Sequence, residues 1–285
     1  MTGFNELQSR LHGHPLQRID TPFGAVQYRH AGAPLAKTTH VLLHGIGSGS
    51  GSWLMQLEAA AHHADHVGVV AWEAPGYGAS DPVTADEPVA QDYAQRIWSW
   101  LDALGLKHPV NLVGHSLGAL MAASAAAAQP ARVSRLTLLA PAQGYGLADP
   151  VLRQQKRQDR LQALHTLGPQ GMAQQRSAAM LSSLASPAQQ AFVRELMSQV
   201  IPSGYTQATH MLSQGHIASD LKRCKVPLGI ASGHADGITP VASCQSLAAE
   251  CGVDWHDLGE VGHACALEAA AAVNAFIGLA EKTPA

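Results

Sequence analysis

Short apolar runs alternate with longer stretches of helical character along the first half of the chain. The runs are rich in valine and leucine and too short for helices, so strands are predicted at 39–43, 67–72, 110–113 and 133–139. The stretches between them predict helices at 55–64, 92–104 and 119–128. An antiparallel hairpin is predicted at 19–29, with its turn at Phe23 and Gly24. Strands that alternate with helices in this way predict a parallel sheet covered by helices.

The alternation stops midway along the chain and resumes in its last quarter. The stretch without a strand pattern is expected to hold three helices, at 152–167, 171–184 and 188–200. Two more strands and a final helix follow, at 226–231, 253–258 and 267–280. We therefore predict a core domain made of 1–142 and 216–285, with 143–215 inserted as a helical cap. A separate second domain is the less favoured alternative, because the insertion is short for a core of its own.

The composition is that of a globular protein: 46% of the 285 residues are hydrophobic, 14% are charged, and the formal net charge is −3. The sequence has no run of lysine and arginine, so nucleic acid is not expected as a partner. No apolar stretch is long enough to span a membrane, and residues 1–18 lack the apolar segment of a signal peptide. A cytoplasmic location without a membrane partner is therefore expected.

Cysteine and histidine spacing gives no indication of a metal site. The four cysteines lack CxxC spacing and are expected to be free thiols. The 16 histidines are scattered without an HExxH pattern. The glycine-rich loops lack the Lys-Ser/Thr ending of a phosphate-binding loop. Neither a metal nor another cofactor is predicted.

The stretch 114–118, with the sequence Gly-His-Ser-Leu-Gly, joins a predicted strand to a predicted helix. The pattern G-x-S-x-G in that context is typical of a nucleophile elbow, with Ser116 at the apex of a tight turn. Glycine at both ends leaves room for the neighbouring strand and helix. The turn places the N–H of Leu117 at a helix N-terminus, where it can stabilise an oxyanion. Because chance also produces such patterns, the prediction depends on partners elsewhere in the chain.

A serine nucleophile needs a base and an acid that orients the base. Functional residues of a parallel sheet gather at the carboxyl ends of its strands, where the chain has Asp236 and His263. The order Ser116, Asp236, His263 is the one expected for an elbow in this type of sheet. We predict His263 as the base and Asp236 as the acid; the alternatives are a surface loop histidine and a helix N-cap. Asp257 and Glu260 are rival acids, although they lie on the strand and turn of the histidine itself.

The glycine-rich loop after the predicted strand 39–43 is expected to provide a second oxyanion donor. So many glycines after a central strand indicate that the backbone approaches another group closely. We predict that the N–H groups of Ile46 and Leu117 form an oxyanion hole; the alternative is a turn without catalytic duty. The residues predicted to line the substrate pocket are His44, Trp53, Tyr145 and Met172. For Trp53, Tyr145 and Met172, a structural role in the core is the alternative; for His44, it is a structural role in which the side chain bonds the loop.

Five blocks of the sequence, in this order, resemble the α/β-hydrolase superfamily over nearly the whole chain. The blocks are 44–45 (His-Gly) with its glycine loop, 73–81 (Glu-Ala-Pro-Gly-Tyr-Gly-Ala-Ser-Asp), 114–118, 233–236 (Gly-His-Ala-Asp) with Pro240, and 262–263 (Gly-His) followed by Glu268. The resemblance implies an α/β fold with a mostly parallel eight-stranded sheet flanked by helices and a helical cap inserted after strand 6. It also implies the nucleophile Ser116, the acid Asp236, the base His263, and oxyanion donors at Ile46 and Leu117.

Two positions depart from the family pattern. Glu73 stands where the family usually has an aspartate that supports the loop, and no loss of activity is expected from this change. His234 stands where an acidic residue is common. Ser116 at the elbow argues against the haloalkane dehalogenases and epoxide hydrolases, which use aspartate there.

The cap sequence 165–173 looks like the region of 3-oxoadipate enol-lactonases that reads R-x-x-G-M-A, and the loop 44–49 is also similar to that group. The cap has no tryptophan, which departs from the enol-lactonases. The resemblance implies a serine hydrolase that cleaves a carboxylic ester or lactone of a small molecule through an acyl-enzyme. C–C bond hydrolysis of meta-cleavage-type diketones and a non-catalytic ligand receptor on the same fold are the alternatives. The sequence leaves a homodimer open.

Overall fold

The computed structural model describes residues 2–279, and within this range eight strands form one sheet. The strands are β1 (Leu16–Ile19), β2 (Val26–Gly32), β3 (Thr38–Leu43), β4 (Gly68–Trp72), β5 (Val110–His115), β6 (Val133–Leu139), β7 (Leu228–Ser232) and β8 (Trp255–Asp257). Their order is β1-β2-β4-β3-β5-β6-β7-β8, with antiparallel pairing at β1–β2 and β2–β4 and parallel pairing elsewhere. The predicted hairpin and the mostly parallel eight-stranded sheet are confirmed.

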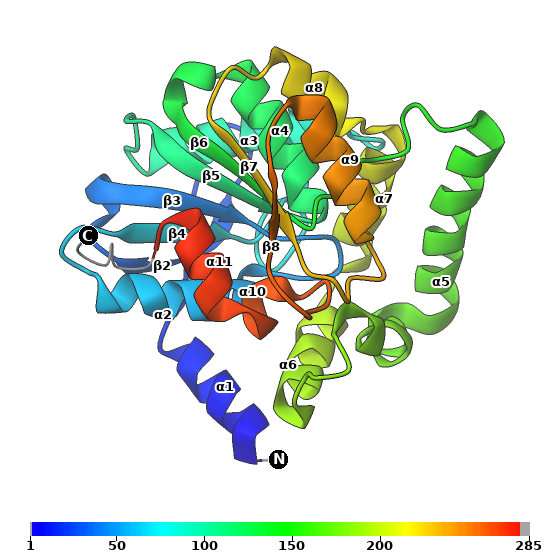
Figure 1. Ribbon diagram of the computed structural model, residues 1–285, viewed down its shortest axis with the longest axis horizontal. Helices are drawn as coiled ribbons and strands as arrows, with labels where there is room; N and C mark the ends of the chain where they lie inside the picture. Colours follow the sequence, from blue (N-terminus) through cyan, green and yellow to red (C-terminus); the bar gives the residue numbers. More distant parts are fainter. Residues whose placement is uncertain (1, 280–285) are drawn as a thin grey trace.

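Helices cover both faces of the sheet and one side of the molecule (Figure 1). They are α1 (Thr2–His12), α2 (Leu54–His62), α3 (Ala90–Ala103), α4 (Leu117–Ala128), α5 (Pro150–Arg176), α6 (Pro187–Ser198), α7 (Pro202–Gln214), α8 (Ile217–Arg223), α9 (Val241–Cys251), α10 (Cys265–Glu268) and α11 (Ala270–Ile277). Short 3₁₀ turns are η1 (Leu35–Lys37), η2 (Ser50–Trp53), η3 (Pro130–Arg132) and η4 (Ala178–Met180). Among residues 2–279, no helix combines the length and the apolar character needed to cross a membrane.

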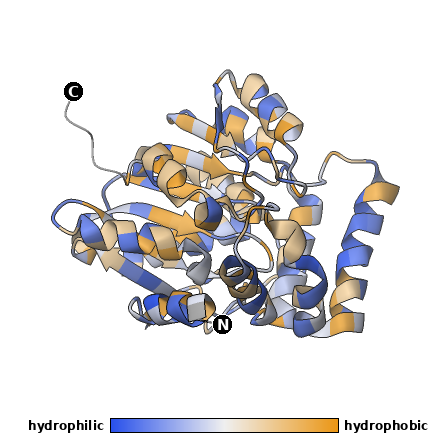
Figure 2. Ribbon diagram, turned by 60° about the horizontal axis from the view of Figure 1, so that its bottom comes forward, coloured by the Kyte–Doolittle hydropathy of each residue, from blue (hydrophilic) through white to orange (hydrophobic). Residues whose placement is uncertain are grey.

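Alternate side chains of the central strands enter two separate cores. In β3, Val41 and Leu43 pack into the core that includes α3 and α4, whereas Leu42 packs into the core that includes α2 and α11. All three side chains are fully buried. Figure 1 shows the two pairs of helices on opposite faces of the sheet, and Figure 2 shows hydrophobic residues concentrated along the strands. Burial on both faces explains why the strand has a continuous apolar sequence.

The sheet topology brings two chemically important loops together. Strand β3 lies between β4 and β5. After β3 the chain therefore forms the neighbouring strand on one side, β4, and then the neighbouring strand on the other side, β5. Ligands of open parallel sheets bind outside the carboxyl ends of the strands at such a point. The loop that begins at His44 follows β3, and the turn that holds Ser116 follows β5, its direct neighbour in the sheet.

Helices α5, α6 and α7 are inserted between β6 and α8, as the break in the strand pattern predicts. Helix α5 is kinked at Gly168, which has a φ of 62° and precedes Pro169. The helix expected to end at 167 therefore continues as a second limb to Arg176. The helix predicted at 171–184 is wrong in its second half, where η4 and an irregular segment follow. In that segment the N–H of Ser182 donates to a carboxylate from α10 rather than to a helical carbonyl.

Helix α1 is not apparent from the apolar pattern, because only a narrow face of it is buried. Leu7 and Leu11 on that face join a small core with Phe192 and Val193 of α6. Helix α1 therefore packs against α6, and its Arg10 also pairs with Glu58 of α2.

Candidate active site

Ser116 lies in the tight turn between β5 and α4, and its backbone conformation is strained. Its φ is 53° and its ψ is −117°, which residues other than glycine rarely adopt. The Ser116 N–H donates to the Leu139 carbonyl (3.0 Å), and the Ser116 carbonyl accepts from the N–H groups of Ala119 and Ala142 (3.1 Å each). The strained turn persists because these hydrogen bonds hold it, as in a nucleophile elbow.

The glycines two residues on either side of Ser116 are required by close backbone contacts. A Cβ on Gly118 would lie 2.2 Å from the Leu43 carbonyl oxygen. A Cβ on Gly114 would lie 2.4 Å from the Gly118 carbonyl oxygen. No side chain fits at these distances, so the steric reason predicted for both glycines is confirmed.

His263 and Asp236 form a buried hydrogen-bonded pair, and His263 lines the same cavity as Ser116. His263 Nδ1 lies 2.8 Å from Asp236 Oδ2, and the two side chains are 1% and 0% exposed. A carboxylate only accepts hydrogen bonds, so Nδ1 carries the proton and donates it. In the neutral tautomer that this hydrogen bond favours, Nε2 is left as an acceptor. The structure thus brings together the three residues that the sequence singled out.

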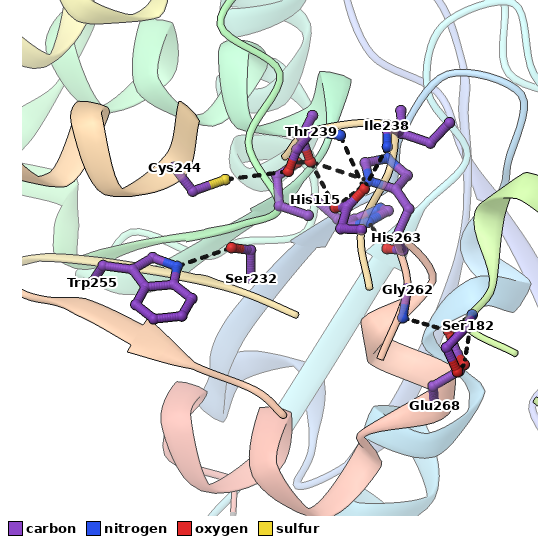
Figure 3. A network of polar contacts seen from close by, with 12 residues as sticks. His115, Ser182, Ser232, Ile238, Thr239, Cys244, Trp255, Gly262, His263 and Glu268 are labelled. Carbon is purple, nitrogen blue, oxygen red and sulfur yellow. Dashed lines mark hydrogen bonds and ion pairs between the residues drawn. The ribbon is translucent and has the colours of Figure 1, made fainter. Parts of the chain in front are cut away.

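Asp236 is held by donors from the loop that precedes α9, and Figure 3 shows two residues of this loop, Ile238 and Thr239, near His263. Its Oδ1 accepts from the N–H groups of Ile238 (2.8 Å) and Thr239 (2.9 Å), and its Oδ2 accepts from Thr239 Oγ1 (2.7 Å). Burial alone would raise the pKa of Asp236, but the hydrogen bond and charge of His263 and the donors of Thr239 hold that pKa below its ordinary value. The carboxylate therefore remains ionised beside the histidine.

Thr239 is a site residue that the sequence reasoning missed. Its hydroxyl also lies 3.3 Å from His263 Nδ1. The signal that could have indicated it is the Asp-x-x-Thr spacing, which allows the aspartate to accept from the backbone N–H groups of its own turn. Asp236 is not the N-cap of a helix, because α9 begins later, at Val241. It accepts hydrogen bonds from the loop that leads into α9.

The rival acids are directed away from His263. Asp257 Oδ2 pairs with His234 Nε2 at 3.0 Å, and the two side chains are 48% and 42% exposed. This pair gives the unusual His234 a partner on the surface. Glu260 is exposed to solvent. Asp236 is therefore the acid that reaches the histidine.

His115, which flanks the nucleophile, is a second site residue, and its contact with His263 is not indicated by the sequence. Its Nε2 lies 2.7 Å from the His263 carbonyl oxygen, which can only accept, so Nε2 carries a proton and donates it. The two rings lie with centroids 4.7 Å apart. Burial, with a further contribution from His263, lowers the pKa of His115 to about 3. His115 is therefore a neutral donor that fixes the backbone of His263.

Stability is expected to fall as the pH drops below about 6.5. Burial lowers the pKa of His40, His44 and His115 in the folded protein, whereas unfolded histidines titrate near pH 6.5. Between about pH 6.5 and the lowered folded-state pKa, the unfolded chain binds more protons. The free energy of unfolding then decreases by up to about 1.4 kcal/mol per pH unit for each such histidine. Urea unfolding between about pH 7.5 and 5 measures the slope.

The variant His115→Asn serves as the comparison for this pH dependence. It removes one titrating group, so its free energy of unfolding should depend less steeply on pH than that of the wild type. An unchanged slope would contradict the assignment of a strongly lowered pKa to His115.

Ile46 and Leu117 both line the cavity that Ser116 and His263 line. Leu117 is the first residue of α4, so its N–H has no acceptor within the helix. Among the hydrogen bonds of residues 2–279, none has either N–H as its donor. A Cβ on Gly45 would lie 2.8 Å from Ser116 Cβ, so the loop after β3 packs directly against the elbow. Two free donors are therefore available beside the serine.

The loop after β3 is held from behind by His44 and Glu73. The N–H of Ala74 donates to His44 Nε2 (3.0 Å), so His44 Nδ1 carries the proton and donates to the Gly45 carbonyl (2.8 Å). Glu73 Oε1 accepts from the N–H (3.0 Å) and hydroxyl (2.5 Å) of Ser50. His44 lines neither cavity at the site. The prediction that it lines the pocket is wrong, whereas the alternative, a structural role in which His44 bonds the loop, is confirmed by these hydrogen bonds.

A cavity of about 510 Å³ reaches Ser116 and His263 and is enclosed in part by the inserted helices. Tyr145 and Met172, two of the predicted pocket residues, line it. Trp53 lines a smaller cavity of about 40 Å³ that reaches the same serine and histidine. The volume of the larger cavity is in the range of sites that bind small molecules.

Glu268 connects the inserted segment to the loop that carries His263, as Figure 3 shows. One carboxylate oxygen accepts from the Gly262 N–H (2.9 Å), and the other accepts from Ser182 Oγ (2.6 Å). The position of the segment after α5 is therefore coupled to that of the histidine.

The part of the chain that the structure describes contains no group of three His, Cys, Asp or Glu side chains arranged for a metal ion. The four cysteines are free thiols, as their spacing predicts.

A family model described as the alpha/beta hydrolase family matches residues 41–276. Among curated proteins, the chain is similar to (E)-2-((N-methylformamido)methylene)succinate hydrolase of Acinetobacter baylyi, with 33% identity over 99 residues (35% of this chain, 36% of the relative). It is also similar to the 2-hydroxy-6-oxononadienedioate/2-hydroxy-6-oxononatrienedioate hydrolase of Paraburkholderia xenovorans, with 32% identity over 128 residues (43% of this chain, 42% of the relative). The matches thus span well under half the length of these relatives.

Solved structures share the fold over nearly the whole chain. The enol-lactonase from Burkholderia xenovorans LB400 matches with a TM-score of 0.79 and 19% identity, covering 92% of this chain and 98% of that one. A thermophilic esterase from Thermogutta terrifontis also matches with a TM-score of 0.79 and 19% identity, covering 93% of this chain and 97% of that one. At this level of identity the likeness concerns the fold.

Proposed function

The chain belongs to the alpha/beta hydrolase family, and from that premise we propose that it is a serine hydrolase acting on a carboxylic ester or lactone of a small molecule. In this proposal Ser116 is the nucleophile, His263 the general base and Asp236 the acid that orients the base. The N–H groups of Ile46 and Leu117 form the oxyanion hole. The observation that carries the proposal is the 2.8 Å pair of Asp236 and His263 at the cavity that Ser116 lines.

The proton positions at His263 support the role of a base. Because Nδ1 donates to Asp236, Nε2 has a free lone pair that can take the proton of the Ser116 hydroxyl. The ionised Asp236 then stabilises the imidazolium that forms. His115 fixes the backbone of His263 without introducing a competing charge, since it remains neutral.

The reaction proceeds in two halves. Ser116 Oγ attacks the carbonyl carbon while its proton moves to His263 Nε2, and the N–H groups of Ile46 and Leu117 stabilise the oxyanion. The C–O bond to the leaving alcohol breaks as Nε2 returns the proton to that oxygen, which leaves an acyl-serine. Water then attacks the acyl group, with the same histidine as base, and releases the acid and the free serine.

The proposal is tested by rapid-mixing measurement of p-nitrophenolate release from p-nitrophenyl butyrate. A burst that matches the enzyme concentration is expected, together with a butyryl group on the peptide containing Ser116 by mass spectrometry. Both signals should be absent in Ser116→Ala. They should persist in Ser134→Ala, which changes an exposed serine on β6. Steady Ser116-dependent turnover without a burst would also support the proposal, with acylation as the slow step.

Release that does not depend on Ser116, or no release from any ester or lactone, would contradict the proposal. In the second case, ligand-induced thermal stabilisation without product formation would instead favour a non-catalytic receptor on this fold.

A second candidate function keeps the same residues and changes the bond that is cleaved. It is favoured by the similarity to the Paraburkholderia xenovorans hydrolase named for 2-hydroxy-6-oxononadienedioate. A yellow dienol of a vinylogous 1,5-diketone provides the assay. Ser116-dependent loss of its colour, without turnover of p-nitrophenyl esters, would favour C–C hydrolysis over ester hydrolysis.

A further inference from the structure

Two arginines of the kinked helix α5 line the large cavity. Arg160 lies on the first limb of the helix and Arg176 at the end of the second. The two residues are 16 positions apart, which is about 24 Å along a straight helix. The kink at Gly168 is therefore what allows both guanidinium groups to serve one cavity. Figure 1 shows α5 along the outer side of the molecule.

Among residues 2–279, no carboxylate forms an ion pair with either arginine. Among the described residues that line the cavity, none is an aspartate or a glutamate. Within residues 2–279, Arg160 and Arg176 form no ion pair and no side-chain hydrogen bond. Other arginines of the same helix do: Arg157 lies 3.6 Å from Glu87, and Arg153 donates to the Gly146 carbonyl (3.5 Å).

Both arginines are half-buried, so their positive charges at the cavity are available to pair with an anionic ligand. The guanidinium group keeps its charge at every physiological pH and offers paired donors that match the two oxygens of a carboxylate. Neutral polar residues at the same cavity, Gln143, Tyr145 and Ser243, add further hydrogen-bonding groups without negative charge.

We propose that Arg160 and Arg176 form a carboxylate-binding site in the large cavity, so that the ester or lactone cleaved at Ser116 is itself an anion. This inference rests on the proposed function for its meaning in catalysis. The carboxylate belongs to the part of the substrate that extends from Ser116 toward α5.

The smaller cavity indicates the nature of the group on the other side of the scissile carbonyl. It also reaches Ser116, and its volume is about 40 Å³ against about 510 Å³ for the larger one. Its apolar lining comes from Trp53, Val193, Leu196 and Leu267. A substrate that fits both cavities has a short apolar group on one side and a longer group ending in a carboxylate on the other.

The experiment compares pairs of esters that differ in a carboxylate. One pair has the charge in the acyl group (mono-p-nitrophenyl glutarate against p-nitrophenyl valerate). The other pair has it in the leaving group (4-carboxyphenyl butyrate against phenyl butyrate). The measured quantity is the ratio of kcat/KM for the anionic ester to kcat/KM for the neutral one. The wild type should prefer the anionic ester in at least one pair, and the preference should weaken with added salt.

In Arg160→Gln and Arg176→Gln the anionic-to-neutral ratio of the preferred pair should fall by about tenfold to a hundredfold. Arg160→Lys should restore part of it, because the charge returns without the paired donors. Lys156→Gln is the matched control: it removes an exposed positive charge from the same helix, away from the cavity, and should leave the ratio within about twofold. Thermal melts show whether each variant is folded.

Ser116-dependent turnover of the neutral esters without an anionic preference in either pair would overturn the inference and leave the proposed function intact. If the wild type cleaves no ester at all, the proposed function fails and calorimetric titration with glutarate decides the inference. Glutarate binding to the wild type that is lost in Arg160→Gln and Arg176→Gln would support the carboxylate site. No binding, or equal binding to all three proteins, would overturn it.

Discussion

Asp236→Asn is expected to lower kcat/KM for p-nitrophenyl butyrate by about 10⁴-fold. The Ile238 and Thr239 N–H groups anchor Oδ1, so the asparagine oxygen takes that position and its NH₂ group faces His263 Nδ1. Nδ1 can accept from this donor only if the histidine proton moves to Nε2. The nitrogen that should take the serine proton is then blocked. Steady-state kinetics on the folded variant measures the loss.

Asp257→Asn is the matched control for this variant. It makes the same chemical change in the exposed pair with His234, whose Nε2 lies 3.0 Å from the carboxylate. Its activity should stay within about twofold of the wild type, because the pair lies on the surface. A loss of less than about tenfold in Asp236→Asn would contradict the assignment of Asp236 as the residue that sets the histidine tautomer.

Gly118→Ala is expected to destabilise the protein by about 3 kcal/mol or more. The added Cβ would lie 2.2 Å from the Leu43 carbonyl oxygen and 2.8 Å from that of His44. Both oxygens belong to backbone at the end of β3, so relief requires a shift of a central strand or of α4. In a helix where the added methyl group meets no neighbour, replacing glycine by alanine stabilises by roughly 0.5–1 kcal/mol. A destabilising effect at Gly118 would therefore indicate the close contact with β3. Urea unfolding monitored by circular dichroism provides the free energy.

Gly237→Ala is the steric control, because a Cβ at that position meets no heavy atom within 4 Å. Its free energy of unfolding should differ from the wild type by no more than about 0.5 kcal/mol. If Gly118→Ala were equally well tolerated, the close contact between α4 and β3 could not be the reason for glycine at the elbow.

The pairing of Asp236 with His263 could be anticipated because local patterns mark each residue. Each follows a predicted strand, and the carboxyl ends of neighbouring parallel strands meet at one edge of the sheet. The glycines at 114 and 118 carried the same kind of information, since only a close backbone contact explains their spacing around the serine. Such signals are local, and the sheet then brings them together.

The contacts of His115 and Thr239 could not be anticipated in this way. His115 and His263 are 148 positions apart in the sequence. Their hydrogen bond depends on how closely the loop that carries His263 approaches the end of β5. Many histidines in the chain have similar surroundings in sequence, so nothing local distinguishes the one that supports His263.

By itself the sequence determined the layered core and the chemistry at its edge. Apolar runs too short for helices form strands buried on both faces, and this burial dominates the free energy of folding wherever it is possible. The alternation of strands and helices followed from that pattern, and it placed the elbow and the glycine loop after predicted strands. The helical insertion was also visible, as the stretch where strand patterns are absent.

Only the tertiary structure decided which side chains line the large cavity at Ser116. Arg160 and Arg176 are distant in sequence and lie on a helix whose pattern shows no common face for them; the kink at Gly168 and the packing of the inserted helices bring both to one cavity. Whether a charge meets a partner depends on distances of a few ångströms between separate segments, because the energy of a charge depends on its immediate surroundings. The hydrophobic pattern of each segment indicates which of its side chains will be buried. The charges that line a pocket, in contrast, depend on which segments the folded chain brings together.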